Sequence, residues 1–107
     1  DLKYAYKPFV GAWVTTTIVA SGDVGMHASL GVDRAGGVHV SYYDHTNRDL
    51  MHAYKPSGGS WTATIVDSVG DVGRHTALAV DAAGRVHITY LDYTAYVLKY
   101  TYHCPPR

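Results

Sequence analysis

The chain has 107 residues, which is enough for one domain at most. Nine Lys and Arg balance nine Asp and Glu, which argues against a protein that binds nucleic acid or an anionic membrane through charge. Ten Tyr and eleven Gly favour strands and turns over helices, and no apolar run reaches the roughly 20 residues of a transmembrane helix.

Nine short extended runs separated by turn residues predict an all-β protein, since no window has helical periodicity. The expected strands are residues 2–7, 13–19, 27–33, 38–44, 50–55, 61–67, 75–81, 86–92 and 97–102. The segments Asp33-Arg-Ala-Gly36 and Asp81-Ala-Ala-Gly84 are predicted to close turns in which Gly takes the left-handed position. These runs are typical of an antiparallel meander.

The runs recur because the chain repeats itself with a period of 48 residues. Asp1-Leu-Lys-Tyr-Ala-Tyr-Lys-Pro8 returns as Asp49-Leu-Met-His-Ala-Tyr-Lys-Pro56, and 49 − 1 = 48. Residues 1–48 are therefore one repeat, 49–96 a second, and 97–107 an extra strand that begins a third. Such a period indicates units that bury their apolar faces only against their neighbours.

The third run of each repeat predicts how neighbouring sheets pack. Ser29 and Gly31 place small side chains on one face, whereas Leu30 and Val32 fill the other. This asymmetry suits the innermost strand of a sheet that packs closely between two others. With that strand innermost, the chain divides into a pair of strands, a sheet of four and a sheet of three.

The repeat resembles the blades of secreted bacterial and archaeal β-propeller proteins. The resemblance rests on Gly-Asp-Val-Gly-x-His, Leu-x-Val-Asp-x-Ala-Gly-x-Val-His, Asp-Leu-x-x-Ala-Tyr-Lys-Pro and the Trp that follows, and it covers essentially the whole chain. It implies four-stranded antiparallel blades, two repeats plus one extra strand per chain, and an extracellular or cell-surface location. It also implies a binding or adhesion module rather than an enzyme.

The extra strand predicts an assembly. Two blades do not close a ring, which typically needs about four to eight. The chain opens at Asp1 without an initiator Met, so we expect a processed form or a piece of a longer protein. The expected partners are further copies of the chain, in a ring or filament, or neighbouring repeats of a longer chain. The candidate assembly residues are Leu2, Tyr4 and Tyr6 with their copies Leu98, Tyr100 and Tyr102.

A mixture of aromatic and polar side chains suggests a second function, a multivalent lectin-like propeller that binds a glycan. A sugar needs a flat apolar platform and fixed hydrogen-bond partners, and repetition would provide avidity. The alternative is that these rings only cover blade faces. The candidate ligand-binding residues are Trp13, Tyr42, Tyr43, Asp44, His45, Trp61, Tyr90 and Asp92.

No pattern predicts catalysis, a metal or a cofactor. The sequence contains no nucleophile elbow, phosphate loop or dinucleotide fingerprint. His39 and His87 are expected to pack on the sheet surface beside Tyr43 and Leu91, because zinc-type ligand spacing is missing. Cys104 is the single cysteine, so it is either incidental or pairs between chains.

Overall fold

The computed structural model describes residues 1–103, so Cys104 lies outside the described residues. This part of the chain is all-β, as expected, with antiparallel pairing throughout. No helix among the described residues is long and apolar enough to span a membrane. The strands are β1 (Leu2–Tyr6), β2 (Val14–Val19), β3 (Val24–Val32), β4 (Val38–Asp44), β5 (Asp49–Lys55), β6 (Thr62–Asp67), β7 (Val72–Val80), β8 (Val86–Asp92) and β9 (Val97–His103).

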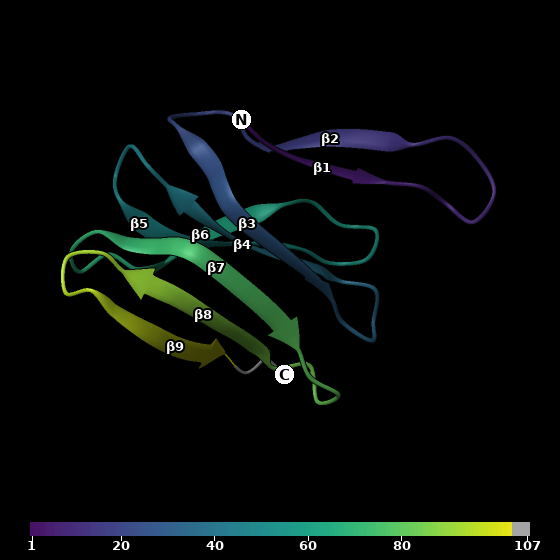
Figure 1. The fold of residues 1–107 in the computed structure, drawn as a ribbon. Helices are drawn as coiled ribbons and strands as arrows, with labels where there is room; N and C mark the ends of the chain where they lie inside the picture. The colour runs from purple at the N-terminus through teal and green to yellow at the C-terminus, as the bar shows by residue number, and fades with distance from the viewer. Residues whose placement is uncertain (104–107) are drawn as a thin grey trace.

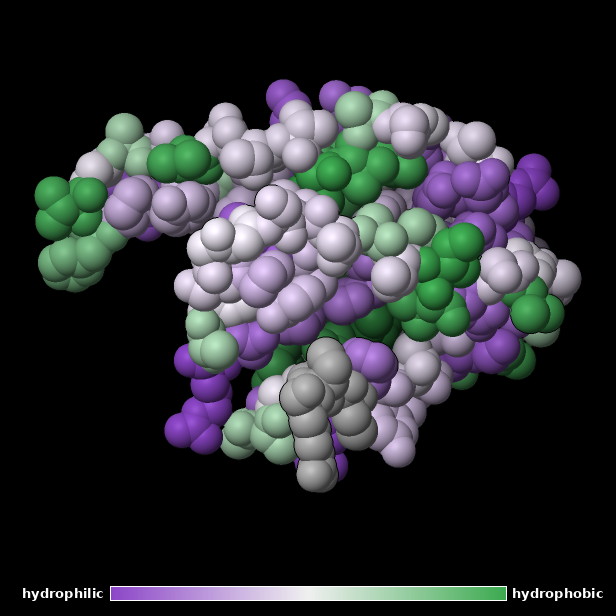
Figure 2. All heavy atoms as spheres, turned by 180° about the vertical axis from the view of Figure 1, so that it is seen from behind, coloured by the Kyte–Doolittle hydropathy of each residue, from purple (hydrophilic) through white to green (hydrophobic). Residues whose placement is uncertain are grey.

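The strands form three sheets, with the orders β1-β2, β3-β4-β5-β6 and β7-β8-β9 (Figure 1). This confirms the expected division into two, four and three strands, so the four-stranded sheet straddles the boundary between sequence repeats. Strand register repeats as well, because Leu2 pairs with Val19 as Leu50 pairs with Asp67. The hairpin of β1 and β2 projects from the body, and hydrophobic atoms gather at its tip (Figures 1 and 2).

Strands β3 and β7 begin three residues before the sequence predicts. Gly25 has a φ of 105° and His27 a φ of 56°, and the pairing of β3 with β4 shifts register between Val24 and Met26 and again before Ser29. Gly-rich sequence here marks a bulge within the strand instead of a loop before it. Gly73 and His75 repeat the same conformation in β7.

Each sheet covers the apolar side chains of the one before it. Leu2 of β1 is buried with Val38, Val40 and Tyr42 of β4. One repeat later, Leu50 of β5 is buried in a second cluster of five residues: Leu50, Val72, Val86, Ile88 and Tyr90. The hydrophobic core of the described residues therefore consists of two small clusters, one at each junction between sheets.

The contact between β3 and β7 is close because Gly31 has no side chain. A Cβ at that position would stand 2.7 Å from Leu78 Cδ2 and 3.0 Å from Val80 Cγ2. The small face of β3 thus receives the aliphatic face of β7, which confirms the packing predicted for the third run.

Hydrogen bonds reinforce the same junction. Leu78 N donates to Ser29 Oγ at 3.0 Å, and Ser41 Oγ donates to Thr76 Oγ1 at 2.9 Å. The Tyr43 hydroxyl donates to Asp71 Oδ1 at 2.5 Å. The second and third sheets are therefore held together by polar as well as apolar contacts.

Candidate functional site

Two aspartates that close turns also hold a histidine. Asp33 Oδ1 accepts hydrogen bonds from Ala35 N at 3.0 Å and Gly37 N at 2.7 Å, while Gly36 N donates to the Asp33 carbonyl at 3.1 Å. Gly36 has a φ of 86°, so the predicted turn is confirmed. Asp33 Oδ2 contacts His39 Nε2 at 3.0 Å. This contact is the largest of the influences that lower the pKa of Asp33.

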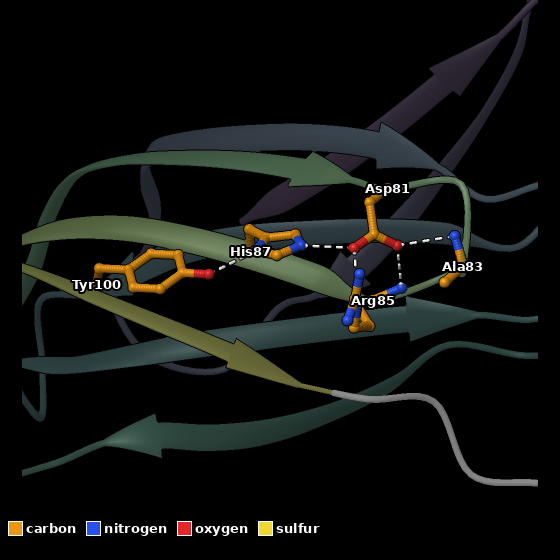
Figure 3. Close-up of polar contacts among 5 residues, drawn as sticks. All are labelled: Asp81, Ala83, Arg85, His87 and Tyr100. Atoms are coloured by element: carbon orange, nitrogen blue, oxygen red, sulfur yellow. Dashed lines mark hydrogen bonds and ion pairs between the residues drawn. The ribbon is translucent and has the colours of Figure 1, made fainter.

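The second repeat contains the same arrangement (Figure 3). Asp81 accepts hydrogen bonds from Ala83 N at 2.9 Å and from Arg85 N at 3.0 Å, and its Oδ2 contacts His87 Nε2 at 2.8 Å. Arg85 Nε adds an ion pair at 2.7 Å. The hydrogen bond from His87, followed by those from Arg85, holds the pKa of Asp81 well below its usual range.

The carboxylate determines which nitrogen of each neutral imidazole carries the hydrogen. An ionised carboxylate only accepts, so Nε2 of His39 and of His87 must donate. Nδ1 of the neutral ring is then an acceptor. In the first repeat Nδ1 of His39 faces His52 Nε2 at 3.1 Å, and in the second Nδ1 of His87 faces the Tyr100 hydroxyl at 2.6 Å. We call these sets the Asp33–His39–His52 row and the Asp81–His87–Tyr100 row.

The two imidazoles of the first row meet edge to edge. The ring planes differ by 14°, and the ring centroids are 5.3 Å apart. This distance exceeds the 3.1 Å between His39 Nδ1 and His52 Nε2 by about two ring radii, as expected for rings that lie side by side in one plane. This geometry directs a hydrogen along the line between the nitrogens. Burial, with the charges of His39 and His103, lowers the pKa of His52 to about 4, so His52 is a neutral donor near pH 7.

The rows therefore orient hydrogen bonds across each turn and its neighbouring strands. No group of three or more His, Cys, Asp or Glu within residues 1–103 is arranged to hold a metal ion. A cavity of about 600 Å³ lies beside the first row, and His39, His52 and Tyr54 line it opposite Val86, Ile88 and Thr101. It separates the outer parts of the second and third sheets.

Most of the predicted ligand-binding residues are buried. The exposed fractions of Tyr42 and Tyr43 are 1% each, and those of Asp44, Tyr90 and Asp92 are 7%, 4% and 8%. Their ring faces and carboxylates are therefore not open to a sugar, because adjacent sheets and turns cover them. His45 and Trp13 are exposed, and half-buried Trp61 meets Tyr4 edge-on at 5.3 Å.

The polar groups of this buried set have structural partners. Tyr90 donates to Asp67 Oδ2 at 2.7 Å. Asp44 Oδ2 accepts a hydrogen bond from Asn47 Nδ2 at 2.8 Å, and Asp92 Oδ1 accepts one from Ala95 N at 3.1 Å. Both aspartates thus stabilise the turns that follow their strands.

The predicted assembly residues fall into two groups. Leu98, Tyr100 and Tyr102 of β9 are exposed by 74%, 57% and 59%. Their counterparts on β1 are more covered: Leu2 is buried at 5%, Tyr4 is half-buried and Tyr6 is exposed at 46%. Strand β9 therefore presents an open apolar and aromatic face.

Two ion pairs tie β9 to the second sheet and to β8 in its own sheet. Lys99 Nζ lies 3.6 Å from Asp67 Oδ2 and 3.8 Å from Asp92 Oδ2. Burial acts to raise the pKa of Asp67, but hydrogen bonds from Val69 N and Tyr90 and the charge of Lys99 lower it overall. Lys99 thus neutralises two acidic groups at the junction.

The expectation that His39 and His87 pack beside Tyr43 and Leu91 is wrong, because an aspartate holds each ring. Tyr54 stacks on His39 at 4.6 Å, and Tyr100 lies 5.9 Å from His87. The signal was the repeated spacing of six residues, 39 − 33 and 87 − 81, across a turn that brings both side chains together. The chain matches no family model, curated protein or solved structure.

Proposed function

We propose that the chain is an extracellular structural or adhesive module of the β-propeller type, whose sheets serve as blades and associate with neighbouring units. The resemblance of the repeat supports the location and the blade interpretation. The antiparallel sheets of two, four and three strands, joined by close packing at β3 and β7, are compatible with it.

One observation carries the proposal: three repeat-equivalent leucines differ only in whether a following sheet covers them. Leu2 and Leu50 are exposed by 5% and 0%, beneath the second and third sheets, whereas Leu98 is exposed by 74%. Burying such a side chain contributes about 1.5–3 kcal/mol. The face that contains Leu98 therefore has the same leucine that is buried between sheets in the other repeats, but no sheet covers it among the described residues.

Open strand edges add to this argument. The second sheet has four strands, whereas the third has three and the first has two among the described residues. The free edge of β9 and the free edge of β1 present unpaired backbone groups, which favour pairing with another chain. Association that completes the sheets would pair the backbone groups of both edges and would cover the exposed side chains of the open face.

The mass of the full chain, measured by light scattering over a range of concentrations, tests this proposal. We expect particles of two or more chains. Ala79 is exposed on the face of β7 that points away from Leu78 and β3, so Ala79→Glu should yield monomers. Ala82→Glu, in the exposed turn after β7, is the matched control and should not change the mass. A parent chain that remains monomeric at high concentration would refute self-association.

A lectin-like function is the alternative, and one observation favours it. Tyr100, Tyr102 and His87 form a flat row of rings, with angles of 15° to 25° between their planes. The two tyrosines are more than half exposed, so their apolar faces are open to a sugar ring. A glycan array tests this function: Tyr102→Ala should abolish binding, whereas Tyr96→Ala, another exposed tyrosine, should not. The absence of binding across a broad array would exclude it.

A further inference from the structure

We propose that strand β1 of a second copy replaces β9 beside β8, so that the β1–β2 hairpin of one copy completes the third sheet of another. This inference rests on the proposed self-association and names the pairing that produces it. The partner is a second copy of this chain, and the site is the edge of β8 together with Asp67, Asp92 and His87.

The side chains of β9 that contact its surroundings are the ones that β1 shares with it. Lys99 forms ion pairs with Asp67 and Asp92, and Tyr100 bonds to His87. The equivalents of Lys99 and Tyr100 on β1 are Lys3 and Tyr4, whereas those on β5 are Met51 and His52. Strand β1 therefore brings the same charge and the same phenol to the junction, and the middle copy does not.

The register of the exchanged strand follows from the repeat. Equivalent residues of β1 and β9 differ by 98 − 2 = 96 positions, and β8 pairs Tyr90 with Lys99 and Thr89 with Tyr100. In the exchanged sheet Tyr90 pairs with Lys3 of the second copy, and Thr89 pairs with its Tyr4. Lys3 then lies between the two acidic groups that Lys99 neutralises in the single chain, so charge complementarity supports this register.

Strand β9 is the one that leaves, because its contact with the second sheet is an ion pair that Lys3 can replace, whereas β1 is held to the second sheet by a buried leucine. Along its length β1 pairs with β2, and its Leu2 is buried in a core with the second sheet. Among the described residues β9 pairs with β8 alone, and its Leu98 is 74% exposed. Retaining β9 and expelling β1 would break both attachments of β1, whereas the reverse exchange substitutes one β8 pairing for another.

The exchange also provides the missing fourth strand and the missing cover. Strand β2 follows β1 into the sheet in the register that β6 has beside β5. The second copy's own β3–β6 sheet, which already covers Leu2, then lies over the open face of β7 and β8. Each copy adds two complete sheets, so a propeller of about four to eight blades would contain two to four copies.

Disulfide trapping between two differently labelled copies tests the register. One copy contains Thr89→Cys and the other Tyr4→Cys, both in a Cys104→Ser background. Directly paired positions on antiparallel strands lie within the Cα distance that a disulfide spans. We expect a mixed disulfide in most of the mixed assemblies. Ala5→Cys in place of Tyr4→Cys is the matched control and should not cross-link, because successive side chains point to opposite faces.

A charge reversal tests the ion pairs independently. Lys3→Glu would face Asp67 and Asp92, so it should weaken association about tenfold. Lys7→Glu makes the same change on the same segment and should have little effect, since the equivalent His103 forms no ion pair in the described structure. Assembly without the mixed disulfide would overturn the strand exchange and leave self-association standing. A chain that stays monomeric would overturn both.

Discussion

Gly31→Ala tests the packing between the second and third sheets most directly. The new Cβ would lie 2.7 Å from Leu78 Cδ2 and 3.0 Å from Val80 Cγ2, whereas carbon atoms prefer about 3.5–4.0 Å. Val80 is β-branched and stiff at χ1, so it does not turn aside easily. Leu78 must therefore leave its present rotamer, and the Val80 side must yield by a few tenths of an ångström.

The expected cost is the balance of two effects. Overpacking a junction costs about 1–3 kcal/mol. Replacing Gly by Ala also restricts the unfolded chain, which stabilises the fold by about 0.4–1 kcal/mol. We therefore expect Gly31→Ala to lower the free energy of unfolding by about 1–2 kcal/mol, and the Tm by roughly 4 °C for each kcal/mol.

Thermal unfolding followed by circular dichroism measures this loss, and a double mutant isolates its cause. Leu78→Ala removes the atom nearest to the new methyl group, so Gly31→Ala should cost much less in that background. A favourable coupling of about 1 kcal/mol is the expected result of the four-variant cycle. If Gly31→Ala is as stable as the parent, or if the two changes simply add, β3 and β7 are not packed as described here.

Three further predictions concern the cores and the Asp33–His39–His52 row. The pKa of His52 falls from about 6.5 in the unfolded chain to about 4 in the fold, so stability should decline by up to about 3 kcal/mol as pH falls through this window; urea titrations should show the slope, and His52→Tyr should remove most of it, leaving the part that comes from His27, whose pKa burial also lowers. Leu50→Ala should cost about 2–5 kcal/mol in urea unfolding, whereas Leu98→Ala should stay within about 0.5 kcal/mol in the monomer. Tyr43→Phe should cost about 1–2 kcal/mol in the same assay, because Asp71 loses a hydrogen bond; an unchanged midpoint would contradict that bond.

Local pattern was enough to predict the strands and their grouping. Alternating residues such as Leu2, Tyr4 and Tyr6 specify a strand with two different faces, and Pro8 and Pro56 end the first run of each repeat. The starts of β3 and β7 were missed because Gly25 and Gly73 look like loop residues when their bulges are not seen. Local sequence does not show whether an irregular backbone stays paired with its neighbour.

The candidate site was harder to predict, because the burial of its side chains depends on how the adjacent sheet packs against them. Tyr42 and Tyr43 look like platform residues in a sequence, yet the adjacent sheets cover both. The Asp33–His39 pair was missed because two residues six positions apart meet only when a turn folds them together. Its third member, His52, comes from the adjacent strand β5.

The sequence by itself determined the 48-residue repeat, which is read directly from it, and the strand pattern, which follows from side-chain alternation and from turns that span a few residues. The tertiary structure decided which equivalent residues are covered. Leu2, Leu50 and Leu98 are the same residue in the same local setting, but only the first two have a sheet above them. Burial is a property of packing between sheets, so equivalent leucines acquire different exposures, and among the described residues the last of them lies on an open face.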